Sequence, residues 1–146
     1  MDLEQENKER QIWQRVLQQE RPKETLRELI RTSGELAAVY RQLRGALTGQ
    51  SRDLADQLYT EELATMAALR GLGRLMGREG EALKLWQPGK EPVAKQLEKA
   101  YHRTRRCMVD YAARTAEPEF GVVFQTLEHR AQKQCARIVQ LLGSIG

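Results

Sequence analysis

One carboxylate in this sequence falls where a charge is costly. Glu62 lies on the inward stripe of the helical segment "LADQLYTEELATMAAL", which also carries Leu58 and Leu69. A carboxylate buried among apolar side chains is destabilising unless it is paired, hydrogen-bonded or bound to a metal ion. Glu62 is therefore a candidate metal ligand, or a candidate acceptor of hydrogen bonds from polar side chains at the same depth.

The two histidines and two cysteines are further residues that could bind a soft metal or activate a thiolate. If the last two helices turn near Pro118, each histidine lies level with a cysteine. The histidines fall outside the inward stripes, so we expect them at the surface. The cysteines form no CxxC motif and differ in height by roughly 9 Å at 1.5 Å per residue, so we expect free thiols. The level pairs are His102 with Cys135 and His129 with Cys107.

The elements that must position these side chains are helices. Apolar residues recur at three- and four-residue spacing, and period-two alternation is absent, which predicts an all-α fold. We expect one helix from about Lys23 to Leu47, a second beginning near Asp53, a third beginning near Pro92, and a fourth whose first turn contains Pro118. Amphipathic helices of this length with mostly short connections predict an antiparallel four-helix bundle over residues 22–146.

Each helix is predicted to present one stripe to the core. The stripes mix apolar residues with a few polar ones at similar depth. The predicted inward residues are Leu26, Leu29, Ile30, Ser33, Ala37 and Tyr40 in the first helix; Leu58, Glu62, Thr65, Leu69, Leu72 and Met76 in the second; Leu97, Tyr101, Thr104, Met108 and Tyr111 in the third; and Phe124, Leu127, Ala131, Gln134, Ile138 and Leu141 in the fourth.

Residues 1–21 are predicted to form a separate N-terminal helical arm. Its amphipathic helix covers about residues 3–20, and Pro22 interrupts it because proline lacks a backbone donor. Its apolar face can pack on the bundle or on a second subunit, so we expect self-association. The predicted interface residues are Ile12, Trp13, Val16 and Leu17.

The composition of the chain limits the classes of partner that we expect. The chain of 146 residues fits one domain with one core, and its net charge is +4. The charged start lacks an apolar signal core, and no apolar run approaches the ~20 residues that cross a bilayer, so we expect a cytoplasmic protein without a membrane partner. The basic residues are interspersed with acids and lack a nucleic-acid motif, so we do not expect nucleic-acid binding. The two most basic groups are Arg70, Arg74 and Arg78, and Arg103, Arg105 and Arg106.

Three segments resemble the metal helices of rubrerythrin-type ferritin-like proteins. "FGVVFQTLEHRAQKQCARIVQLLG" is similar to the family's last helix, in which a phenylalanine is followed after seven residues by a glutamate and three further on by a histidine. "LADQLYTEELATMAAL" resembles another metal helix, with Glu62 at the glutamate position. "SGELAAVYRQL" is similar to the opening metal helix, whose glutamate lies seven residues before a tyrosine. The resemblance covers residues 23–143 and implies a ferritin-like four-helix bundle with an additional N-terminal helix.

The resemblance also implies a site that has lost its metal. Such proteins hold two irons with a glutamate from each of two helices and Glu-x-x-His from the other two, and they reduce peroxide or oxidise ferrous iron. Of the six ligands only Glu62 remains, which predicts no cofactor and no catalytic residue. The other former ligand positions hold Ser33, Thr65, Tyr101 or Thr104, Ala131 and Gln134.

A closed hydrogen-bond network in place of the metal is the preferred interpretation of these residues. Several donors to Glu62 can come from the inward polar residues at similar depth, which are Ser33, Thr65, Gln134 and either Tyr101 or Thr104. The sequence leaves open two other possibilities. Glu62 can rotate to the helix edge beside Glu61 and reach water, or it can belong to a residual single-metal or small-ligand site.

The functional prediction is accordingly a ferritin-like binding or interaction protein of unknown ligand. The alternative is a rubrerythrin-like oxidoreductase that binds iron or manganese through atypical ligands. Recruiting the two ligands of the last helix would move its apolar stripe to the surface, because adjacent residues lie about 100° apart around a helix. The alternative ligands are Glu35, Glu98, Glu128 and His129.

The connection between the second and third helices decides the topology. Ferritin-like topology requires a crossover along the bundle, which the residues from Met76 to Glu91 can span if they are mostly extended. If they stay helical to Trp86, a simple up-down bundle results instead. The sequence does not choose between the two arrangements.

Overall fold

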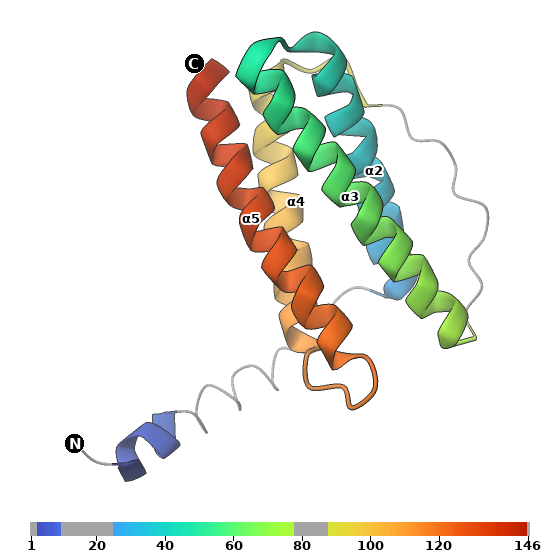
Figure 1. Ribbon diagram of the computed structural model, residues 1–146, viewed down its shortest axis with the longest axis vertical. Helices are drawn as coiled ribbons and strands as arrows, with labels where there is room; N and C mark the ends of the chain where they lie inside the picture. The colour runs from blue at the N-terminus through green and yellow to red at the C-terminus, as the bar shows by residue number, and fades with distance from the viewer. Residues whose placement is uncertain (1–2, 10–24, 78–87, 146) are drawn as a thin grey trace.

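The described part of the chain is helical throughout its regular structure. The computed structural model describes residues 3–9, 25–77 and 88–145 and has no strand within them. This confirms the all-α prediction. Residues 3–9 are helical and exposed, whereas the predicted interface residues Ile12, Trp13, Val16 and Leu17 lie outside the described residues. The four long helices are α2 (Leu26–Ala46), α3 (Gly49–Leu75), α4 (Val93–Ala113) and α5 (Gly121–Ile145) (Figure 1).

Capping residues explain where α2 begins. Thr25 has an extended backbone, and its hydroxyl accepts a hydrogen bond of 3.2 Å from the Glu28 amide. The Glu28 carboxylate accepts one of 2.9 Å from the Thr25 amide in return. This capping box satisfies two amides that have no partner within the helix.

The ends of α3 depend on two glycines. The helix begins at Gly49, earlier than the predicted start near Asp53, because only Leu47 and Thr48 separate it from α2. Gly49 has a φ of 63°, and Gly77, just after the last turn, has a φ of 70°. These left-handed conformations favour glycine, so Gly77 marks the C-terminus of α3 in the way typical of helix C-caps.

The turn between α4 and α5 requires a third glycine. A Cβ atom at Gly121 would overlap the carbonyl oxygen of Thr115. Pro118 lies in this turn, so the prediction that it occupies the first turn of the last helix was wrong. The Gly121 amide donates a hydrogen bond of 3.0 Å to the carbonyl of Glu117, which closes the turn before α5 starts.

Two apolar clusters reveal the direction of each helix. One contains the C-terminal halves of α2 and α5 and the N-terminal halves of α3 and α4. The other contains the opposite halves. Both α3 and α4 therefore run from the first cluster to the second, so the end of α3 and the start of α4 lie at opposite ends of the bundle (Figure 1). The simple up-down arrangement is wrong, and the order of helices is the one that requires a crossover along the bundle.

The predicted stripes face the core. The closest neighbours are α2 with α3 and α4 with α5, and α3 with α5 and α2 with α4 complete the four-sided bundle. All six residues of the predicted α5 stripe are buried. Each apolar side chain of leucine size that is fully buried contributes about 1.5–3 kcal/mol to folding. The predicted inward residues that are only partly buried are Ile30, Met76, Tyr101 and Met108.

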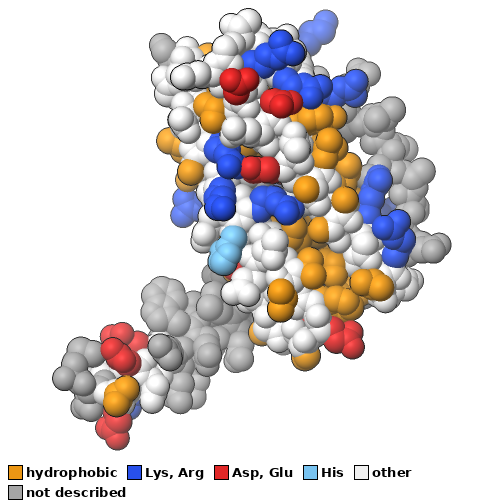
Figure 2. Space-filling model, in the orientation of Figure 1, with side chains coloured by type: hydrophobic (Ala, Val, Ile, Leu, Met, Phe, Trp, Pro, Cys, Tyr) orange, Lys and Arg blue, Asp and Glu red, His pale blue; other side chains and the backbone are white. Residues whose placement is uncertain are grey.

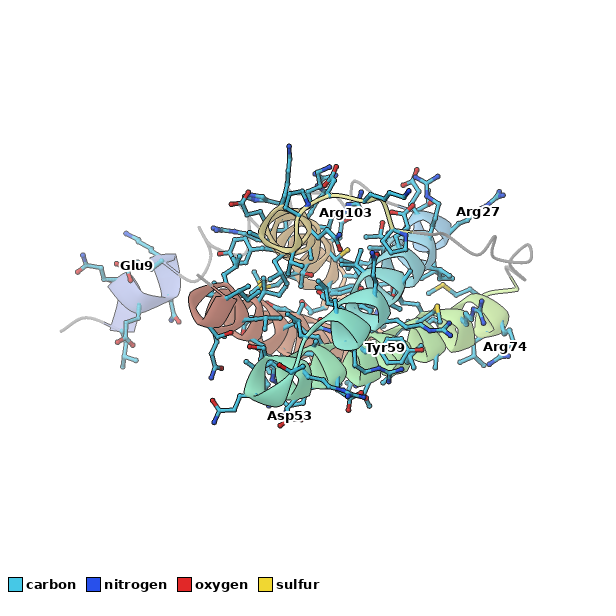
Figure 3. The ribbon with its side chains drawn as sticks, turned by 90° about the horizontal axis from the view of Figure 1, so that it is seen from above. Glu9, Arg27, Asp53, Tyr59, Arg74 and Arg103 are labelled. Atoms are coloured by element: carbon cyan, nitrogen blue, oxygen red, sulfur yellow. The ribbon has the colours of Figure 1, made fainter. Side chains whose placement is uncertain are left out.

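The described helices do not resemble membrane spans. None of the helices in residues 3–9, 25–77 and 88–145 is long and apolar enough to cross a bilayer. Figure 3, which looks along the bundle, shows the helices around a shared interior, with the labelled side chains of Arg27, Asp53 and Arg74 at the periphery.

Candidate functional site

A layer of polar side chains lies at the middle of the bundle, where the two apolar clusters meet. Each long helix contributes at least one member. All of these side chains are buried, although their residue types are ones that usually stay in contact with water. The members are Ser33 and Tyr40 from α2, Glu62 and Thr65 from α3, Thr104 from α4 and Gln134 from α5.

Glu62 is the acceptor at the centre of this layer. Its side chain is only 3% exposed. The Ser33 hydroxyl donates to Oε1 at 2.6 Å, and the Gln134 amide donates from Nε2 to Oε2 at 2.9 Å. Both carboxylate oxygens thus accept a hydrogen bond from a neutral donor on a different helix. This confirms the predicted contacts of Ser33 and Gln134 with Glu62.

The interpretation that placed Glu62 at the helix edge is wrong. It is the neighbouring Glu61 that lies at the edge, where its carboxylate accepts from Arg137 of α5. Adjacent residues point about 100° apart on a helix, so only one of the two glutamates can face the interior. Leu58, Thr65 and Leu69 lie four residues before, three after and seven after Glu62, so all four residues share the inward face of α3.

Thr65 has a different partner from the one predicted. Its hydroxyl accepts a hydrogen bond of 3.1 Å from Nη1 of Arg130 on α5, and no hydrogen bond joins it to Glu62 among the contacts that the structure describes. Arg130 is partly buried and is a member of the site that sequence reasoning missed. The available signal was its spacing, because Arg130 lies one turn before Gln134 on the same helix face.

Two hydroxyl groups of the layer are poorly satisfied. The Tyr40 hydroxyl lies near that of Thr104, but neither oxygen has a hydrogen-bond partner of acceptable geometry within the described residues. Burial, and then the nearby charge of Glu62, raise the pKa of Tyr40 above its usual value, whereas Thr104 opposes the shift. Thr104, and not Tyr101, therefore represents α4 in the layer. Tyr101 is half-buried and contacts the His102 ring edge to face.

Burial also dominates the titration of Glu62. Desolvation raises the pKa of Glu62 to about 7, because the charged form loses its hydration inside the bundle. The hydrogen bonds from Ser33 and Gln134 and the charge of Arg130 oppose this shift. Near neutral pH the side chain therefore exists in both proton states.

The residues proposed as atypical metal ligands do not gather around Glu62. The carboxylate of Glu35 pairs with Arg31 at 3.8 Å and with Arg103 at 3.4 Å at the surface between α2 and α4. Glu98 and His129 are exposed. The fourth of these residues, Glu128, is partly buried on α5.

The donor set does not fit a di-iron centre. Among residues 3–9, 25–77 and 88–145, no group of three or more His, Cys, Asp or Glu side chains could hold a metal ion. Ala131, which stands at a former ligand position, packs in an apolar cluster and offers no ligand atom. Both oxygens of the remaining carboxylate are already engaged by Ser33 and Gln134.

The two histidines lie outside the layer, whereas both cysteines are close enough to Tyr40 to affect its pKa. Both His102 and His129 are exposed, as predicted. Cys107 is buried, Cys135 is half-buried, and neither forms a disulfide bond. Burial raises the pKa of Cys135 above its ordinary value, which disfavours a thiolate nucleophile there.

The basic cluster of α4 borders a surface cavity of about 310 Å³ between α2 and α4. Carboxylates lie in the same cavity, and Glu35 is paired with two of its three arginines. Opposite charges thus alternate along this groove. The lining residues are Glu28, Arg31, Thr32, Glu35, Arg103 and Arg106.

The chain matches no family model, no curated protein and no solved structure in the three comparisons made. Its functional assignment therefore depends on the geometry of the polar layer. In that layer the Glu62 carboxyl group can bind a proton, and its hydrogen bonds connect neighbouring helices. The Ser33 hydroxyl, which donates to Glu62, is buried and so is not exposed to a substrate, and the layer has no second carboxylate beside Glu62.

Proposed function

We propose that this chain is a ferritin-like bundle in which a hydrogen-bonded layer takes the place of a di-iron centre. In this role it acts as a non-catalytic binding or interaction protein. The observation that carries the proposal is the engagement of both Glu62 oxygens by Ser33 and Gln134. A carboxylate that ligates a metal needs at least one oxygen directed at the ion, and here both are directed at neutral donors.

The helix order supports the ferritin-like part of the proposal. Parallel α3 and α4 with a single crossover are typical of ferritin-like bundles, whereas the simplest bundles alternate up and down. The position of the polar layer adds to this support. Metal sites of such bundles are built from inward side chains of all four helices, and the layer here also draws on all four.

Self-association is the proposed mode of interaction. The proposed contact residues are those of the N-terminal arm, Ile12, Trp13, Val16 and Leu17. The bundle itself offers apolar side chains at its surface: Leu75 on α3 and Val122 on α5 are each 75% exposed. Figure 2 shows hydrophobic side chains gathered along α3. Residues of this kind are common in protein interfaces, so the bundle face is the competing contact surface.

Sedimentation of the full chain tests the interaction. We expect an oligomer that dissociates in Trp13→Ser and persists in Leu75→Ser, which changes an exposed apolar residue of the bundle instead. A monomer at all concentrations would contradict self-association. Dissociation by Leu75→Ser alone would assign the contact to α3.

A ferrous iron assay tests the absence of catalysis. The full chain is incubated with ferrous iron and then with peroxide or oxygen, and the rate of iron oxidation is compared with that in buffer. We expect no acceleration. Acceleration that disappears in Glu62→Ala would contradict the proposal and support the rubrerythrin-like alternative.

A further inference from the structure

The outer face of α3 is not covered by any other helix within residues 3–9, 25–77 and 88–145. The helix packs against α2 and α5 through the face that carries Glu62, so side chains about 180° from Glu62 point away from the bundle. These outward residues recur at spacings of three, four and seven, which places them on one stripe of the helix. They are Asp53, Thr60, Ala64, Ala67, Gly71 and Arg74, and all except the half-buried Gly71 are exposed.

The middle of this outer face is apolar. The segment "LATMAAL" from Leu63 to Leu69 contains no charged residue, and its one polar side chain, Thr65, is buried. Leu63 is 38% exposed, and Ala64 is exposed beside it. A helix that is apolar all round is typically buried on every side. The composition of this segment therefore indicates a further contact, and the short alanine side chains allow another helix to come close.

The two ends of the outer face carry opposite charges. Asp53 lies near the N-terminal end of α3 and Arg74 near its C-terminal end, and both are at the periphery of the bundle (Figure 3). No acidic residue follows Glu62 in the helix, so its C-terminal part is purely basic. The face thus runs from a negative end through an uncharged middle to a positive end.

The other charged residues of α3 do not disturb this pattern. The carboxylate of Asp56 is already paired with Arg44 of α2 at 3.1 Å. Arg52 and Arg70 lie 18 residues apart, which is five full turns, so they share one side of the helix. That side is the edge of Tyr59, whose ring lies under the Arg44 guanidinium, and not the outer stripe.

A second copy of α3 complements this face if it runs antiparallel. Asp53 lies ten positions before Leu63, and Arg74 lies ten positions after Ala64. A two-fold axis between Leu63 and Ala64 therefore brings Asp53 of each copy level with Arg74 of the other, roughly 16 Å from the axis at 1.5 Å per residue. The uncharged middles then face each other. Two-fold dimers use the same patch on both copies, and this patch is complementary to itself.

We propose that a second copy of this chain docks antiparallel on the outer face of α3, with Asp53 of each copy beside Arg74 of the other. The inference rests on the self-association of the proposed function and adds a contact of the bundle to that of the N-terminal arm. One pair of helices is a small interface beside the about 1,200–2,000 Å² of stable complexes, so both contacts are needed. Leu75 lies level with Arg52 of the other copy, at the flank of the stripe, and contributes little.

Charge reversal tests the antiparallel arrangement. The dissociation constant of the dimer is measured by sedimentation of the full chain at low salt. Asp53→Arg places like charges together twice and should raise this constant about tenfold. Adding Arg74→Asp exchanges the two charges and should restore the original value. The matched control is Glu98→Arg at an exposed position of α4, which makes the same change of net charge and should leave the constant unchanged.

A substitution at the two-fold axis tests the apolar middle. Ala64→Lys places two ammonium groups beside each other at the axis, so the dimer should dissociate. Ala94→Lys, at an exposed position of α4, is the matched control and should remain a dimer. Both positions are exposed, so both variants keep the buried core, and their helix content by circular dichroism verifies this.

The outcomes separate the α3 contact from the arm contact. A dimer that is unchanged by Ala64→Lys, or a loss in Asp53→Arg that Arg74→Asp does not reverse, would overturn the α3 contact. If Trp13→Ser still dissociates the chain in that case, the arm contact of the proposed function stands. Charge reversal that behaves as expected in a chain indifferent to Trp13→Ser would overturn the arm contact alone. A monomer at all concentrations would overturn both contacts and leave the metal-free layer unaffected.

Discussion

Gln134 of α5 donates a hydrogen bond of 2.9 Å to Glu62 of α3 across 72 positions of sequence. The bond joins the two helical hairpins of the bundle, α2 with α3 and α4 with α5, through their buried sides. Ser33 joins α2 to the same carboxyl group. Glu62 therefore holds three helices together at the level where the two apolar clusters meet.

Gln134→Met tests the bond between the hairpins. Methionine has a similar volume but cannot donate, so Oε2 of Glu62 loses its partner inside the core. We expect a loss of about 2 kcal/mol in the free energy of unfolding, measured with denaturant. The control is Gln132→Met at an exposed position of the same helix, for which the change should stay within about 0.5 kcal/mol. Equal effects of the two variants would show that Gln134 contributes no specific bond.

Ser33→Ala tests how the layer responds to pH. The hydrogen bond from Ser33 lowers the pKa of Glu62, which means that it favours the charged form. Its removal should therefore cost about 1 kcal/mol near pH 5, where Glu62 is neutral, and about 2 to 3 kcal/mol near pH 8, where it is charged. Unfolding at both pH values measures the difference.

The direction in which stability changes with pH follows from the linkage between proton binding and folding. The folded pKa of Glu62, about 7, lies above the ordinary value of 4.5, so the stability from this group is complete below about pH 4.5 and is lost as the pH rises through 7. The loss in the unmodified chain amounts to about 3 kcal/mol. Ser51→Ala removes an exposed hydroxyl pair with Ser144 and should have a small effect that does not depend on pH. A larger cost of Ser33→Ala at low pH would contradict the assignment.

Tyr40→Phe tests the poorly satisfied pair of hydroxyls. The Tyr40 hydroxyl is buried without a partner of acceptable geometry, so its removal should change stability by less than about 1 kcal/mol, or increase it. Adding Thr104→Val removes the facing hydroxyl at nearly constant volume and should leave the double variant at least as stable as Tyr40→Phe. A loss above about 2 kcal/mol in thermal unfolding would mean that the hydroxyl makes a strong bond.

Substitution by alanine is predicted to have opposite effects on stability at two glycines. Gly121→Ala places a Cβ atom on the Thr115 carbonyl and should destabilise the chain by about 1–3 kcal/mol, because backbone must move. Gly71→Ala in α3 meets no atom within 4 Å, so it should stabilise the helix by about 1 kcal/mol. Thermal unfolding of both variants checks this, and a stable Gly121→Ala would contradict the described turn.

Sequence spacing predicted the interior well because each helix repeats it over many turns. Phe124, Leu127, Ala131, Gln134 and Ile138 were all predicted inward on α5, and all are buried. Glu62 was recognised for the same reason, since a charge on an apolar stripe has few explanations. Features that depend on a single residue were harder to predict from the sequence. The start of α3 depends on the positive φ of Gly49, and nothing in the local apolar pattern indicates it.

Two features of the site and fold depend on contacts between distant segments. Arg130 reaches Thr65 from the edge of α5. An arginine at an edge position is usually solvated, so its residue type did not indicate this hydrogen bond. The direction of α4 depends on where the chain returns after Gly77. Periodicity is the same for a helix that runs up or down, and only the packing of both helix ends into the two clusters decides it.

The most direct test of the central claim is the metal content of the full chain purified without chelator, together with its unfolding midpoint before and after chelation. A layer closed by hydrogen bonds predicts no stoichiometric iron or manganese and an unchanged midpoint. Iron or manganese at about two equivalents per chain, lost in Glu62→Ala and accompanied by a lower midpoint after chelation, would contradict the account.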